Sequence, residues 1–219
     1  MSPRALSAAA LAATAALSLL LTACGSDEED DATKPDDKIQ GAEKGEDDSP
    51  SPSAEEEAAG RPEIELPEDL KITFSPEETG DPVKDAVLRD NAERMKAIQS
   101  AIAGLDPKYE ALNYYNTDEA LAESAEWVEQ FKEEKLTVTG AVRYSDRQVT
   151  LNADGTATLT FCADESKGYS KSLETGKVNV TPITKDSYLV YNTKLQKDDQ
   201  GVWRTTSIFS ERGAVQCQP

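Results

Sequence analysis

The spacing of the apolar residues changes near Leu136, and that change limits the folds open to this chain. Between residue 83 and Leu136, apolar residues recur every three or four positions, the spacing of amphipathic helices. After it, they recur at every second position, the spacing of strands with one buried face. Helices followed by a run of antiparallel strands predict an α+β domain, with the helices packed on one face of the sheet.

Three helices are expected before the change. The first is expected within residues 83–104. Gly104 is expected to stop it, because glycine is typical of the position just past the end of a helix. Its charged residues, Arg94 among them, are expected mostly outside the apolar stripe. That stripe consists of Val87, Asn91, Met95, Ile98 and Ile102.

The second and third helices are marked by their first residues. Asp106 followed by Pro107 predicts the start of a short helix that runs through about Tyr114. Asn116 with Glu119 three residues later resembles a capping box, so the third helix is expected to begin there and to end near Lys135.

The strands are bounded by turn residues. Residues 62–75 alternate around Pro67 and predict two short extended segments, of which the first is an edge piece at best. Residues 136–144 predict a strand that Gly140 interrupts with a bulge or bend. Two hairpins are expected later, over 147–164 with a turn at Asp154–Gly155 and over 187–213 with a loop at 198–201, and another turn at Thr175–Gly176.

The N-terminus has the pattern of an exported protein. Arg4 precedes 17 uncharged, mostly apolar residues, which is shorter than the about 20 residues of a membrane-spanning helix and typical of a signal peptide. Leu21-Thr22-Ala23-Cys24 then matches the bacterial lipobox, in which the cysteine is acylated after cleavage. This predicts a signal peptide over 1–23 and a lipid such as palmitate on Cys24, with an uncleaved N-terminal anchor as the alternative. Both interpretations export the rest of the chain.

The next segment, 24–61, is predicted to be a disordered acidic linker. Residues 25–70 contain 18 acidic and 4 basic side chains, and Ile39 is the one large apolar residue within 25–61. As a flexible coil, such a linker spans roughly 30–35 Å. It is expected to hold a single domain, residues 62–219, away from an anionic membrane surface; the other interpretation is an acidic segment that attracts a basic partner.

The predicted lipidation and export also suggest a role for each cysteine. The chain has three cysteines, and an odd number in an exported protein requires an explanation. If Cys24 is acylated, Cys162 and Cys217 remain, and an oxidising compartment favours a disulfide between them. Two unpaired buried thiols are the alternative.

Several short segments together resemble a known group of proteins. The series LPEDLKITF, YYNTDEALAES, TVTGAVRY, TLTFCADES, GVWRTTS and ERGAVQC resembles actinobacterial secreted lipoproteins of unassigned function. Through them the region 62–218 looks like a nuclear-transport-factor-2-like (cystatin-like) domain. The resemblance implies a strongly curved antiparallel sheet around a long helix, a conical cavity, and a cysteine pair at Cys162 and Cys217.

The side chains of the chain limit the functions that it can have. It has no histidine, the commonest acid–base side chain, and its pI near 4.4 argues against nucleic acid as a partner. No cofactor or metal motif is present in the sequence. Asp118 and Glu119 are candidates for catalysis but are better explained as residues of a helix start. Six tyrosines are expected either to line a cavity or to pack in the core: Tyr109, Tyr114, Tyr115, Tyr144, Tyr188 and Tyr191.

Two functions follow from this sequence. The first is a non-catalytic binding or interaction module, anchored by the lipid on Cys24 to the outer face of the cytoplasmic membrane. Its partner is a small molecule or another envelope protein, whose identity the sequence leaves open. The alternative is an extracytoplasmic isomerase- or dehydratase-type enzyme that uses tyrosine and carboxylate side chains in the cavity.

Overall fold

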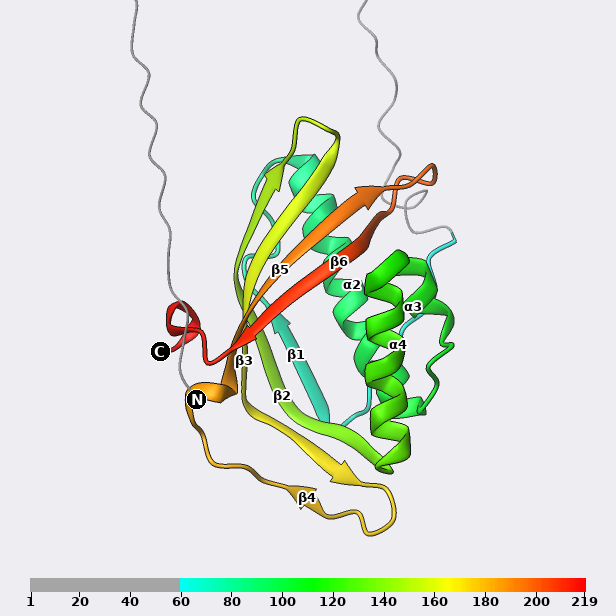
Figure 1. The fold of residues 1–219 in the computed structure, drawn as a ribbon, viewed down its shortest axis with the longest axis vertical. Helices are drawn as coiled ribbons and strands as arrows, with labels where there is room; N and C mark the ends of the chain where they lie inside the picture. Colours follow the sequence, from blue (N-terminus) through cyan, green and yellow to red (C-terminus); the bar gives the residue numbers. More distant parts are fainter. Residues whose placement is uncertain (1–59) are drawn as a thin grey trace, which may run out of the picture. The chain divides into compact units, whose positions relative to one another are not determined.

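The computed structural model describes residues 60–219, which form an α+β domain (Figure 1). The strand β1 (Leu70–Phe74) is followed by three helices, α2 (Pro82–Gly104), α3 (Glu110–Tyr115) and α4 (Asp118–Glu133). The other strands come after the helices: β2 (Leu136–Leu151), β3 (Thr156–Ser172), β4 (Val178–Asn179), β5 (Tyr188–Lys197) and β6 (Trp203–Arg212). The predicted fold class and the change from helices to strands at Leu136 are confirmed.

The strands form one curved, open sheet in the order β1-β2-β3-β5-β6, with β4 paired to the C-terminal end of β3. The prediction of an antiparallel sheet is wrong in one respect. β1 and β2 run parallel, with Leu70 opposite Gly140 and Phe74 opposite Tyr144, so the sheet is mixed. All three helices lie between these two strands in sequence, and a connection of that length allows parallel pairing.

The longest strands are continuous where the sequence suggested a break. Segments 136–144 and 147–151 form the single strand β2, because two shifts of register against β3 absorb the irregularity. Gly140 has a φ of 94°, and a Cβ there would collide with the carbonyl oxygen of Lys167. This position therefore needs glycine, and β2 changes direction here without losing its neighbours.

The helix α2 carries most of the buried helical surface. The side chain of Asp81 accepts hydrogen bonds from the backbone N–H groups of Val83 and Lys84, which fixes the first turn. At the other end Leu105 has the left-handed conformation, with a φ of 52°, so Gly104 is the last helical residue and its predicted role was misplaced by one position. The predicted stripe is buried, and so are Asp90 and Arg94, of which Arg94 was expected outside the stripe.

The second helix starts later than predicted, and the third begins differently. A turn at Asp106, whose side chain accepts a hydrogen bond from the Lys108 N–H, precedes α3. The predicted capping box of Asn116 is wrong: Thr117 precedes α4, and the Asn116 side chain is fully buried and donates to the Leu112 carbonyl. Backbone bridging between Asn116 and Thr205 joins this corner to β6 instead.

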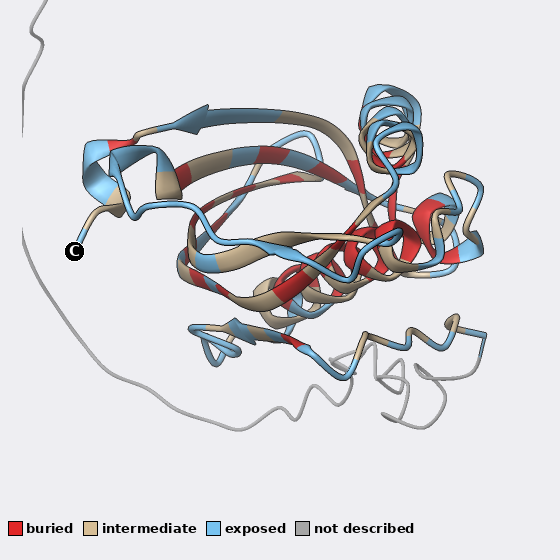
Figure 2. Cartoon of the chain, turned by 90° about the horizontal axis from the view of Figure 1, so that it is seen from below, coloured by how far each residue is buried: buried red, intermediate tan, exposed pale blue. Residues whose placement is uncertain are grey.

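The core fills the space between the helices and the inner side of the curved sheet (Figure 2). Its aromatic part runs across three strands. The ring of Phe161 on β3 packs edge-on to Tyr144 on β2, with centroids 5.8 Å apart, and stacks on Tyr191 of β5 at 4.9 Å. Such pairs contribute about 0.5–1.5 kcal/mol each beyond the area that they bury, so they stabilise the packing of β2, β3 and β5 against one another.

The domain is closed at its N-terminal end by a buried ion pair. Nη1 of Arg61 donates to Oδ1 of Asp90 at 2.6 Å, and the backbone N–H of Trp203 donates to Oδ2 of the same carboxylate at 2.8 Å. Asp90 is 0% exposed, so α2, β6 and the start of the domain meet at this carboxylate. Residues 62–66 form no strand, contrary to the expected edge piece.

The predicted signal peptide, 1–23, lies outside the described residues, and so does the predicted linker up to residue 59.

Candidate functional site

A cavity of about 360 Å³ lies between α2, α4 and the inner face of β5 and β6. We call it the Arg94 pocket. It is lined by Arg94, Met95, Ile98, Glu123, Ser124, Trp127, Leu189, Tyr191, Ile208, Ser210 and Arg212. A second cavity of about 250 Å³ adjoins it toward β2 and β3 and shares Trp127 and Arg212 with it. Together the two cavities occupy the hollow of the curved sheet.

The charged group of the pocket comes from the middle of α2. Arg94 is 2% exposed, and its Nε donates to the Asn116 Oδ1 at 2.5 Å. Its two terminal nitrogens have weaker partners: Nη1 lies 3.3 Å from the Met95 sulfur, and Nη2 lies 3.4 Å from the Ser124 Oγ. All three partners are neutral, so no carboxylate within the described range 60–219 forms an ion pair with this guanidinium.

Burial lowers the pKa of Arg94 to about 10, although Tyr191, Tyr144 and Glu123 act in the opposite direction. The guanidinium therefore stays charged at neutral pH. A buried charge without a counter-ion is costly unless polar groups or a ligand compensate it. Arg94 thus brings a desolvated positive charge to the wall of the cavity.

Two tyrosines adjoin this charge. Burial raises the pKa of Tyr144 well above its usual value, and burial likewise raises the pKa of Tyr191. Both phenols are therefore neutral at physiological pH and are available as hydrogen-bond donors. Gln99, a residue of the adjoining cavity, has a smaller effect on the pKa of Tyr144, in the downward direction.

The rim of the pocket carries both signs of charge. Arg212 is engaged there: its Nη1 donates to Glu165 at 2.9 Å and to the Asp186 carbonyl at 2.6 Å. Glu123 on α4 is exposed at the rim. The inner wall is therefore positive, whereas the rim holds one paired and one exposed carboxylate.

A larger cavity, about 620 Å³, lies elsewhere, beside β1 and the first half of α2. Its buried cation is Arg147, which is 3% exposed and donates to the backbone carbonyls of Pro76 and Leu88 and to Asn91. Its guanidinium also lies over the Phe74 ring, 5.0 Å from the centroid. These contacts tie the β1–α2 connection to β2, so a structural role accounts for Arg147.

The candidate catalytic carboxylates are not brought into the Arg94 pocket. Asp118 and Glu119 are exposed in the first turn of α4. The tyrosines divide into two groups. Tyr191 lines the pocket, and Tyr144 is buried in the core next to it without lining either cavity. Tyr115 is buried in a separate cluster with Tyr109 and Tyr114 packed against it, and Tyr188 is half-buried at the start of β5.

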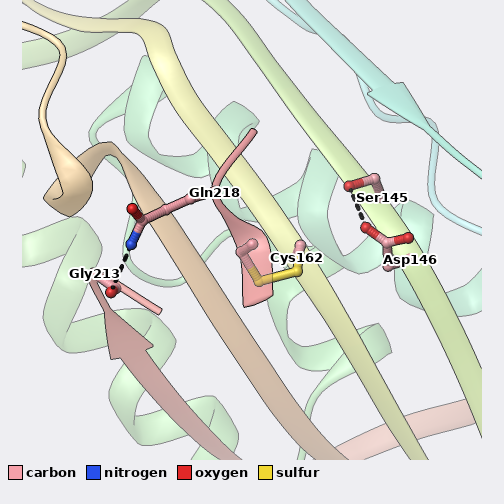
Figure 3. The surroundings of a disulfide bond; sticks show 6 residues. Ser145, Asp146, Cys162, Gly213 and Gln218 are labelled. Atoms are coloured by element: carbon pink, nitrogen blue, oxygen red, sulfur yellow. Dashed lines mark hydrogen bonds between the residues drawn. A yellow bond between two sulfur atoms is a disulfide. The ribbon is translucent and has the colours of Figure 1, made fainter. Parts of the chain in front are cut away.

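The predicted cysteine pair is brought together. Cys162 on β3 and Cys217 in the C-terminal 3-10 turn (Val215–Cys217) lie at disulfide distance, with their Cα atoms 5.4 Å apart (Figure 3). Figure 3 also shows Gln218 donating a hydrogen bond to the Gly213 carbonyl, at 3.1 Å. The C-terminal segment is therefore held against β3 on the side of the sheet away from the pocket, because Phe161 and Cys162 point to opposite faces.

The remaining expectations concern the lipid anchor, membrane-spanning helices and metal sites. Cys24, the predicted lipidation site, lies outside the described residues. Over residues 60–219, no helix is both long and apolar enough to cross a membrane. In the same part of the chain, no three His, Cys, Asp or Glu side chains gather as a metal site would require.

Sequence reasoning missed the residue that defines the pocket. Arg94 was placed with the solvent-facing charges of α2, yet it lies three positions after Asn91 and four before Ile98, both on the predicted stripe. That helical spacing puts Arg94 at the border of the buried face. The spacing of Arg94 from Asn91 and Ile98 therefore indicated burial, but its positive charge favoured a position in solvent.

No protein family and no curated protein matches this sequence. Solved structures give weak likenesses. The intermembrane space region of the chloroplast protein ARC6 is 17% identical with a TM-score of 0.42, over 62% of this chain and 99% of that one. Aln2 from a Streptomyces species is 16% identical with a TM-score of 0.41, over 61% and 93%. ActVI-ORFA from Streptomyces coelicolor is 11% identical with a TM-score of 0.41, over 59% and 96%. Likenesses of this size carry no argument about the site.

Proposed function

We propose that this chain is a lipid-anchored binding module on the outer face of the cytoplasmic membrane, and that a small molecule binds in the Arg94 pocket without being turned over. The observation that carries the proposal is the cavity of about 360 Å³ with a buried guanidinium in its wall. Ligand sites are usually cavities of about 300–1,000 Å³, lined mainly by apolar side chains with a few convergent polar groups. The Arg94 pocket has this size and this composition.

The ionisable groups around the pocket support binding over turnover. General acid–base catalysis works best when the pKa of the catalytic group lies near the working pH. Burial moves the pKa values of Tyr144 and Tyr191 in the unfavourable direction, upward from an ordinary value of 10.0. The carboxylate of Glu165 is engaged with Arg212, and Asp118 lies outside the pocket.

The anchoring part of the proposal is supported by the sequence Leu21-Thr22-Ala23-Cys24. Two or more acyl chains bind a protein stably to a bilayer, because each buried methylene contributes about 0.8 kcal/mol. We expect the wild-type protein to sediment with membranes and to carry the mass of an acylated N-terminal cysteine. Cys24→Ser should abolish both, whereas an unmodified thiol at Cys24 in membrane-extracted wild type would refute the anchor.

The pocket is tested with two adjacent tryptophan substitutions on β6. Ile208 lines the pocket, and its neighbour Phe209 is 64% exposed on the other face of the strand. Ile208→Trp should fill the pocket and remove small molecules that co-purify with the full chain from native membranes, as measured by mass spectrometry. Phe209→Trp is the matched control and should leave them bound. An identical set of co-purified molecules in wild type and both variants would refute the pocket as the binding site.

One observation favours the enzyme as a second candidate. Tyr191 is a neutral proton donor that lines the same pocket as the Arg94 guanidinium, an arrangement able to stabilise a developing oxyanion. If the enzyme is correct, a co-purified molecule incubated with the protein should change its mass or isomeric form. Tyr191→Phe should then stop the change while the domain stays folded.

A further inference from the structure

We infer that the ligand of the Arg94 pocket is an amphiphilic monoanion, with its carboxylate or sulfonate group on the Arg94 guanidinium and its apolar body against Trp127 and Ile208. This inference rests on the proposed binding function and adds the chemical class of the ligand. Two observations carry it: the unmet hydrogen-bonding capacity of Arg94, and the apolar walls that surround it.

The first observation concerns the two terminal nitrogens of Arg94. Among the contacts that the structure describes, Nη1 meets only the thioether sulfur of Met95, a weak acceptor, and Nη2 meets the Ser124 hydroxyl at 3.4 Å. The Ser124 hydroxyl already donates to the Ala120 carbonyl at 2.7 Å. Nε, by contrast, is well occupied by Asn116. The planar edge formed by Nη1 and Nη2 is the part of a guanidinium that binds a carboxylate with two parallel hydrogen bonds.

Arg147 shows what a buried structural arginine looks like in the same domain. Its terminal nitrogens donate to two backbone carbonyls and one amide oxygen, and its plane lies over an aromatic ring. Arg94 has none of the backbone carbonyl acceptors and no aromatic ring among its described contacts. Neither arginine has an anionic partner among the described residues, but the terminal nitrogens of Arg147 have backbone carbonyl acceptors, whereas those of Arg94 meet only a thioether and a distant hydroxyl.

The second observation concerns the apolar walls of the pocket, which determine the chemistry of the uncharged part of the ligand. Ile98 of α2, Trp127 of α4, Leu189 of β5 and Ile208 of β6 line the pocket from four sides. A fully polar anion would leave these side chains in contact with water, whereas an apolar body buries them. The ligand is therefore expected to carry its charge at one end.

The rim limits the charge to one. Arg212 is already paired with Glu165, so Arg94 is the one buried cation without an ion pair among the described residues that line the pocket. The exposed carboxylate of Glu123 lies at the rim and repels further negative charge. A dianion such as a phosphate monoester would be repelled there without a second cation to compensate.

The test compares two probes with the same carbon skeleton, one anionic and one neutral. The full chain, reconstituted in lipid nanodiscs, is titrated by calorimetry with 4-phenylbutanoate and with its neutral amide, 4-phenylbutanamide, and empty nanodiscs serve as the blank. Wild type should bind the anion at least about tenfold more tightly than the amide, because charge-assisted bidentate contacts are much stronger than neutral ones. Arg94→Met should remove this preference, and Arg94→Lys should restore part of it.

A second pair of variants avoids changing the core. Glu123→Gln removes the exposed charge at the rim and should tighten binding of 4-phenylbutanoate about two- to threefold at low salt, with no effect on the amide. Glu126→Gln makes the same change at an exposed position of α4 that does not line the pocket, and it should alter neither probe. This pair decides the question if Arg94→Met loses its native circular dichroism spectrum.

The outcomes separate the two proposals. Equal binding of anion and amide by wild type, together with no effect of Glu123→Gln, would overturn the anionic ligand and leave the pocket as a binding site. Binding of neither probe would also overturn the anionic ligand. The binding function itself is judged by the molecules that Ile208→Trp displaces, so it fails independently.

Discussion

Removing the link between Cys162 and Cys217 should destabilise the domain mainly through its unfolded state. The two cysteines are 55 positions apart, and a cross-link that closes a loop of this length is worth about 4 kcal/mol in the chain-entropy model. Few native contacts depend on it. Ala214 is buried, and the Gly213 N–H donates to the Tyr188 carbonyl at 2.8 Å with or without the bridge.

The perturbation is the double variant Cys162→Ala/Cys217→Ala, compared with wild type in the presence and absence of reductant. We expect the free energy of unfolding to fall by about 4 kcal/mol and the melting temperature by about 8–16 °C for a domain of this size. Because the unfolded chain expands when the loop is opened, the urea m-value should rise. The native far-UV circular dichroism spectrum should stay the same.

Treatment with reductant distinguishes the effect of losing the cross-link from the effect of replacing the cysteine side chains. Reduced wild type and the double variant should have nearly equal midpoints, because both lack the bridge but only the variant has lost the sulfur atoms. Two reactive thiols on native wild type, or equal midpoints with and without reductant, would show that the link does not form. A fall in midpoint with an unchanged m-value would refute the unfolded-state explanation.

Three further substitutions test single contacts by urea unfolding. Gly140→Ala should cost about 2 kcal/mol or more, since its Cβ would meet the Lys167 carbonyl at a positive φ; an unchanged midpoint would contradict the need for glycine. Asp90→Asn should cost about 2–3 kcal/mol, less than a fully buried pair because Arg61 is partly exposed, and a double-mutant cycle with Arg61→Met should show coupling above zero. Asp81→Ala should cost about 1 kcal/mol through loss of the helix cap, and a cost near zero would argue that the cap is dispensable.

Much of the fold could be predicted because it depends on residues that are close together in the sequence. The stripe on α2 and the alternation after Leu136 each follow from a period that burial imposes on one face of an element. The turn at Asp154–Gly155 and the loop at residues 198–201 are where the hairpins reverse, because these residues adopt turn conformations at little cost.

The errors concern features that depend on distant partners. The parallel direction of β1 depends on β2, which the helices separate from it in sequence. Asn116 looked like a cap because Glu119 follows it at the spacing of a capping box, but its side chain accepts a hydrogen bond from Arg94 and donates one to the Leu112 carbonyl. Arg94 itself is buried because β5, β6 and α4 close over it. A single sequence shows the spacing of such residues and not the elements that cover them.

The parallel pairing of β1 with β2 also sets the order in which the chain assembles during synthesis. β1 emerges first, yet its whole pairing partner is present only when Tyr144 has been made. Until then the apolar face of α2 has no sheet to cover it, and non-local pairings of this kind form slowly. Cys217 follows Cys162 by 55 positions, so the link between them cannot form until β5, β6 and the turn after them have been made. The covalent closure of the domain thus comes after the pairing partners of every strand have been synthesised.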